Sequence, residues 1–139
     1  MKSYTDLEQS KKLAEILPLE SADMRYGYIA PYEYSDRKFD GGWDEIPYPK
    51  DFMLKNPNFS EDEYDGELPC WSLAALLNII PKRIKDFNVL RIDIGEEDFA
   101  IWYDEIGYGV NTEFPDITKA SAVDACAEMI IKLKEKNLI

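Results

Sequence analysis

The chain has 139 residues, of which 45% are hydrophobic and 13% aromatic, so it is too apolar for an intrinsically disordered protein, and we predict a single domain over residues 1–139. Twenty-eight acidic against sixteen basic residues give a net charge of −12, which disfavours direct nucleic-acid binding because phosphate backbones are repelled. The absence of histidine excludes Ser-His, Cys-His and His-metal sites within one chain.

The first predicted element is a helix over residues 6–17. Thr5 and Glu8 have the spacing of a capping box, apolar residues follow at helical spacing, and Pro18 ends the helix because its ring cannot continue the hydrogen-bond ladder. A short strand is expected over residues 25–30.

Prolines and aromatic residues alternate between residues 31 and 67. The four prolines of this stretch exclude a long helix, and its many aromatic side chains exclude a solvated linker. We therefore predict a long, aromatic-rich irregular segment that packs on the core.

The run over residues 68–80 is apolar on nearly every side, which predicts a central helix with Pro69 in its first turn and Pro81 after its end. Alternating apolar residues predict a strand over residues 89–94. After a turn-like sequence, the apolar run over residues 99–103 predicts a second strand, and a third strand is expected over residues 108–112.

A last helix is predicted from Ser121 to about Lys136, with three lysines near its C-terminal end. The expected fold is therefore an α+β domain. Three main helices pack on a small antiparallel sheet of about three strands, and the aromatic irregular segment completes the core.

Both cysteines lie in apolar stretches of helical pattern, where a free cysteine behaves as a small buried hydrophobe. The Cys70-Trp71 pair faintly resembles the cysteine-tryptophan pair of papain-like proteases, but the glycine and serine that precede the cysteine there, and the histidine base, are absent. We interpret Cys70 as core packing, with a redox-sensitive thiol as the alternative.

Two acidic groups invite a test for chemistry. Residues 61–67 have partial EF-hand spacing, but Ser72 stands where that motif needs a bidentate glutamate, so a solvated loop is favoured. Glu96–Asp98 and Asp104–Glu105 flank a predicted strand and could bring two carboxylates together, as some hydrolases require. Turn residues are usually acidic for solubility alone, so solubility is the favoured interpretation. We predict no catalytic residue, no metal site and no cofactor.

Aromatic residues with acidic neighbours point to a partner-contact surface, because tyrosine and tryptophan are enriched at protein interfaces. An acidic rim would favour a basic protein partner. The predicted surface comprises Tyr34, Asp40, Trp43, Asp44, Glu45, Tyr48, Glu61, Asp62, Glu63 and Tyr64.

Two segments, Pro69–Leu77 and Ala122–Met129, together with the opening helix after Thr5, resemble a group of small uncharacterised proteins from gut bacterial genomes and their prophages or mobile elements. The resemblance covers most of the chain and implies a common fold. The group has no assigned activity, so no catalytic residue is carried over.

We expect a non-enzymatic protein-binding module of mobile-element or phage origin. Two alternatives stay open: an acidic inhibitor, either an immunity-type protein or a DNA mimic, that occupies a basic nuclease or DNA-binding protein, and a carboxylate- or thiol-based enzyme. The sequence has no apolar segment long enough to span a membrane and no secretion signal, so we expect no membrane association and a cytoplasmic location.

Overall fold

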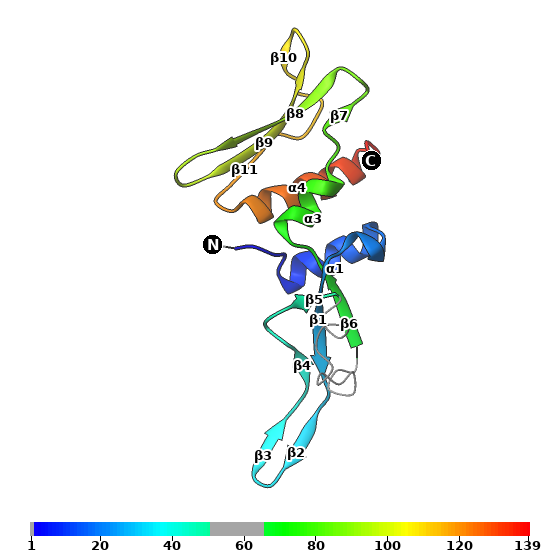
Figure 1. The fold of residues 1–139 in the computed structure, drawn as a ribbon, viewed down its shortest axis with the longest axis vertical. Coiled ribbons are helices and arrows are strands. Elements are labelled where there is room, and N and C mark those ends of the chain that lie inside the picture. The colour runs from blue at the N-terminus through cyan, green and yellow to red at the C-terminus, as the bar shows by residue number, and fades with distance from the viewer. Residues whose placement is uncertain (1, 51–65) are drawn as a thin grey trace. The chain divides into compact units, whose positions relative to one another are not determined.

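The computed structural model describes residues 2–50 and 66–139, which divide into two compact units (Figure 1). The first unit spans Asp6–Trp71, and the second unit joins Met1–Thr5 to Ser72–Ile139. Whether the two units behave as the single predicted domain stays a prediction.

Helix α1 (Leu7–Ile16) opens the first unit and confirms the predicted N-terminal helix. Its capping box lies one residue later than predicted: the Asp6 carboxylate accepts from the Gln9 amide at 2.8 Å, and the Gln9 side chain accepts from the Asp6 amide at 3.1 Å. Carboxylate acceptors serve at this position as well as hydroxyls do, and Thr5 is instead fully buried. A short 3-10 helix, Leu19–Ser21, follows α1.

Strand β1 (Met24–Ile29) is the centre of a four-stranded antiparallel sheet. It pairs with β6 (Gly66–Cys70) on one side, and with β4 (Gly42–Trp43) and β5 (Tyr48–Pro49) on the other. Helix α1 packs against β6. The strand predicted at residues 25–30 is thereby confirmed.

A separate two-stranded hairpin interrupts this sheet between β1 and β4. It consists of β2 (Tyr32–Tyr34) and β3 (Arg37–Phe39), and neither strand pairs with another strand of the described chain. The prediction of an irregular segment is therefore wrong for residues 31–50, where β2 to β5 lie, because short strands escape a search for longer periodic patterns.

The central helix was predicted too long. Residues 66–70 form β6, and α3 (Leu73–Ile79) begins only after Ser72, whose hydroxyl accepts from the Ala75 amide at 3.2 Å. Pro69 thus lies in an edge strand, where its missing N–H is tolerated, instead of in the first turn of a helix.

A five-stranded antiparallel sheet forms most of the second unit, with β9 bonded to β8 on one side and to both β10 and β11 on the other. Its strands are β7 (Arg83–Ile84), β8 (Asn88–Ile94), β9 (Phe99–Glu105), β10 (Gly109–Val110) and β11 (Ile117–Lys119). The structure confirms the predicted strands at 89–94 and 99–103, shortens the third to two residues, and adds β7 and β11.

Helix α4 (Ala122–Glu135) confirms the predicted last helix and packs against β9, β11 and α3 (Figure 1). Its buried residues, among them Met129, Ile130 and Leu133, meet a sheet face that carries the buried Ile101 and Tyr103. These contacts form the core of the second unit.

The first residues of the chain belong to the second unit. Tyr4 forms a β-bridge with Ser72, and the Leu73 amide donates to the Ser3 carbonyl at 3.1 Å. Lys2 forms an ion pair with Asp124 at 2.7 Å. Along the chain, the whole first unit is therefore inserted between Thr5 and Ser72 of the second unit.

The predicted fold of three helices on one small sheet is wrong. Within the described residues, three α-helices accompany antiparallel sheets of four, five and two strands, so mixed α and β composition is retained but the single small sheet is not. None of the helices in the described ranges is long and apolar enough to cross a membrane.

Candidate contact surface

Among the described residues of the first unit, the β2–β3 hairpin carries the most exposed aromatic side chains. Tyr34 and Arg37 are directly opposite across a two-residue turn, which Ser35 closes with a φ of 56°. Alternation along each strand places Tyr32, Tyr34 and Phe39 on the same face, and the rings of Tyr32 and Phe39 are 5.4 Å apart. Tyr32 is 54% and Tyr34 77% exposed, so this aromatic face is open to solvent.

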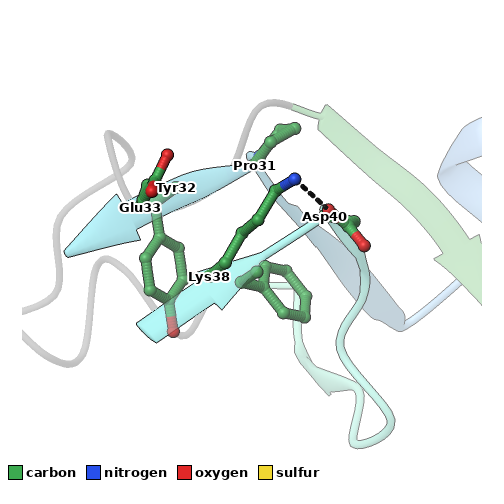
Figure 2. A pocket seen from close by; sticks show the side chains of 6 residues that line it. Pro31, Tyr32, Glu33, Lys38 and Asp40 are labelled. Atoms are coloured by element: carbon green, nitrogen blue, oxygen red, sulfur yellow. Dashed lines mark ion pairs between the residues drawn. The ribbon is translucent and has the colours of Figure 1, made fainter. Parts of the chain in front are cut away.

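A shallow hollow of about 290 Å³ lies at the base of the hairpin (Figure 2). Its walls are Pro31, Tyr32, Glu33, Lys38, Phe39 and Asp40. Lys38 extends toward Asp40, with 3.8 Å between the ammonium and the carboxylate, and both side chains are largely exposed (Figure 2). Such a pair is strongly screened by water, so the hollow offers a charged rim and an aromatic wall rather than a buried polar site.

Gly41 anchors the hairpin to the sheet. Its φ is +90°, and a Cβ at this position would lie 3.0 Å from both the Pro31 ring and the Tyr28 hydroxyl. Only glycine therefore allows the returning strand to pass this closely. Tyr28 also meets Trp43 edge to face, with ring centroids 5.3 Å apart.

The described part of the predicted contact surface divides into exposed and supporting residues. Tyr34, Asp40 and Glu45 are exposed, whereas Trp43 and Asp44 are half-buried, with the Asp44 carboxylate accepting from the Ile46 amide at 3.3 Å. Glu61, Asp62, Glu63 and Tyr64 lie outside the described residues.

Tyr48 lies in the interior and supports the surface from below. Its hydroxyl donates to the Glu67 carboxylate at 2.8 Å, and Glu67 is also 3.9 Å from the Arg25 guanidinium. This polar cluster was not predicted, because its members are far apart in sequence and meet only when β5 and β6 pair with β1. The contact role of the remaining surface residues stays a prediction.

The sequence analysis also missed Tyr32, Arg37 and Phe39. A signal was present: Tyr32 and Tyr34 alternate with Glu33, Phe39 follows three residues after the turn, and the Ser35-Asp36 pair between the two stretches is typical of a tight turn. Four nearby prolines masked it.

Both cysteine side chains are fully buried. Burial raises the pKa of the Cys126 thiol to about 11, which keeps the sulfur protonated near neutral pH. Packing is therefore the role that the structure favours for both thiols.

The carboxylates considered for hydrolysis are not brought together. Asp98 and Asp104 lie at opposite ends of β9, and six residues of extended strand separate them by about 20 Å. Paired catalytic carboxylates lie within about 5–10 Å of each other. In the ranges that the structure describes, no three His, Cys, Asp or Glu side chains are grouped so that they could hold a metal ion.

The comparisons with known proteins add no relative: the chain matches no protein-family model, no curated protein and no solved structure. The interpretation of the site therefore depends on its own geometry.

Proposed function

We propose that this chain is a non-enzymatic binding protein that engages a protein partner through the β2–β3 hairpin. The observation that carries the proposal is the aromatic face of the exposed Tyr32 and Tyr34 and the half-buried Phe39, on a hairpin that pairs with no other described strand. An isolated two-stranded hairpin gains little stability from its own contacts, so large apolar rings on it are better explained by a partner than by folding.

Tyrosine suits this role because its ring buries a large area at low entropy cost while the hydroxyl keeps a hydrogen-bonding group at the rim. Arg37 shares the aromatic face and offers a planar donor for a carboxylate or a carbonyl. The hollow beside Lys38 gives an incoming side chain a place to insert.

Charge favours a basic partner. The first unit has sixteen acidic and seven basic residues, so it carries nine of the twelve net negative charges of the chain. Such a surface accelerates encounter with a positively charged protein and weakens as salt screens the charges. Two buried free cysteines are compatible with the cytoplasmic location that forms part of this proposal.

Site-specific photo-crosslinking tests the proposal. A photoreactive phenylalanine analogue replaces Tyr34, and a control protein carries it in place of Tyr108, which is 84% exposed but lies in the second unit. Both proteins are irradiated in lysate of the source organism at low and high salt, and crosslinked products are identified by mass spectrometry.

We expect position 34 to capture one discrete protein, with a yield that falls at high salt, and position 108 not to capture it. The double variant Tyr32→Ser/Phe39→Ser, with the analogue still at position 34, should lose the product. Identical products from positions 34 and 108, or none at either salt concentration, would count against the hairpin as a contact surface.

A further inference from the structure

Strand β8 has an apolar half that the second unit leaves uncovered. Ile92 and Ile94 are directly opposite Ile101 and Phe99 of β9, so all four side chains are on the same sheet face. Ile101 and Phe99 are buried, but Ile92 is 41% and Ile94 77% exposed. The turn between β8 and β9 extends past the beginning of α4 (Figure 1), and at this end the core face is covered over β9 but not over β8.

The backbone of the same half-strand is also unpaired on its outer edge. The Gly95 amide donates to the Asp98 carbonyl, and the Ile106 amide donates to the Phe87 carbonyl. The backbone hydrogen bonds between β8 and β9 therefore involve the odd-numbered residues of β8. Hydrogen bonds alternate along an antiparallel pair, and the even-numbered residues therefore point away from β9.

The Leu90 amide confirms this direction, because it donates to the Lys82 carbonyl beside β7 at 2.9 Å. Strand β7 reaches no further, since it pairs only with Asn88 and Val89. The amides and carbonyls of Ile92 and Ile94 thus form an open edge that no described strand covers. Exposed edge strands are usually protected by a proline or a lysine. Strand β8 contains neither residue.

The charge around the edge is acidic. Arg91 is 3.2 Å from Asp104, so its charge is compensated, while Asp93, Glu96 and Glu97 form no ion pair within the described residues. Two copies of this chain would not pair well here. An antiparallel pair that used both isoleucines of each copy would centre on Asp93 and place two carboxylates opposite each other.

We propose that the outer edge of β8 binds an extended segment of a basic partner as an added antiparallel strand. Alternate apolar side chains of that segment would cover Ile92 and Ile94, and its basic side chains would lie near Asp93, Glu96 and Glu97. Main-chain hydrogen bonds give affinity in this mode of recognition, and alternate side chains give specificity.

The probe is a fluorescent heptapeptide of alternating lysine and valine, capped at both ends, and its binding to the full chain is followed by fluorescence anisotropy. Residues directly opposite in an antiparallel pair share a sheet face, so valines opposite Ile92 and Ile94 turn their amides toward β8. We expect N-methylation of the valine amides to weaken binding by about tenfold or more, and N-methylation of the lysine amides to leave it nearly unchanged.

Two matched variants locate the site. Ile94→Lys should weaken binding by about tenfold, because it removes apolar contact and adds repulsion. Ile46→Lys should have no effect, since Ile46 is similarly exposed (71%) but lies in the first unit. Both side chains are solvent-facing, so both variants should fold.

No binding of the unmodified peptide, equal binding of both methylated peptides, or equal effects of the two lysine variants would overturn the proposal. The outcome is separable from that of the hairpin, because Tyr32→Ser/Phe39→Ser changes only the first unit and should leave peptide binding intact.

Discussion

Asn88 provides the most direct test of what holds the second unit together. Its side chain is nearly fully buried, and its amide nitrogen donates to the Ile84 carbonyl at 3.1 Å. Its amide oxygen accepts from the Asn111 side chain at 2.7 Å. One residue of β8 therefore joins β7 to the loop that follows β10.

Asn88→Ala should lower the free energy of unfolding by about 2–4 kcal/mol. The Ile84 carbonyl is left without this donor in a buried position, which costs about 1–3 kcal/mol. The half-buried Asn111 amide can regain water, so its loss should be limited to about 1 kcal/mol. Total stabilities of about 5–15 kcal/mol make this a substantial fraction.

Urea denaturation followed by circular dichroism, together with hydrogen exchange of the Ile101 and Tyr103 amides, measures the effect. Asn111→Ala is the partner variant. It breaks the same side-chain bond and leaves the buried Asn88 amide oxygen without this donor, at a cost of about 1–3 kcal/mol, but it keeps the bond to the Ile84 carbonyl, so its cost should be smaller than that of Asn88→Ala. The double variant should be less destabilised than the sum of the two single variants. A loss below about 1 kcal/mol for Asn88→Ala would refute the assigned role of the buried carbonyl.

Three further predictions follow from local geometry. Gly41→Ala should cost about 2 kcal/mol and Gly107→Ala about 1 kcal/mol in thermal unfolding, because both have positive φ but only Gly41 is crowded; equal losses would contradict the anchoring role of Gly41. Because the pKa of Cys126 is raised to about 11, its thiolate should form only as the pH approaches that value. Both cysteines are buried, so alkylation followed by mass spectrometry should label neither of them in the folded chain at pH 7. Rapid stoichiometric labelling would show that the thiols are accessible. Ser121→Ala should destabilise α4 by about 1 kcal/mol, whereas Ser121→Asp should preserve stability, because either a hydroxyl or a carboxylate can accept from the Asp124 amide. Similar losses in both variants, measured by urea denaturation, would argue against capping.

The longer elements could be predicted from the sequence because each shows several turns or repeats of one pattern. Helices α1 and α4 have clear apolar stripes and capping residues, β8 alternates from Leu90 to Ile94, and β9 begins with a run of five apolar and aromatic residues after a turn sequence. The run at 66–80 was misassigned because continuous apolar character does not distinguish a buried strand from a helix. Residues 66–70 form a strand because they pair with β1, and this pairing is not apparent from the sequence of the run itself.

The candidate surface was predicted in composition but not in arrangement. Tyr34 and Asp40 were included in the predicted surface because tyrosine is enriched at protein interfaces and acidic residues favour a basic partner. Sequence alone could not show that Tyr48 turns inward to Glu67. That direction depends on which strands flank β1. The unpaired edge of β8 likewise could not be predicted from the sequence, because it depends on where β7 ends.

The bridge between Tyr4 and Ser72 has a consequence for the order of folding during translation. A ribosome delivers Asp6–Trp71 before any of the helices and strands that follow Ser72, so the first unit can fold while the second consists of a few waiting N-terminal residues. Those residues find their partners only when Ser72 and Leu73 have emerged. Assembly of the second unit therefore begins late in synthesis, when residues 3 and 4 can pair with the start of the segment that follows the first unit.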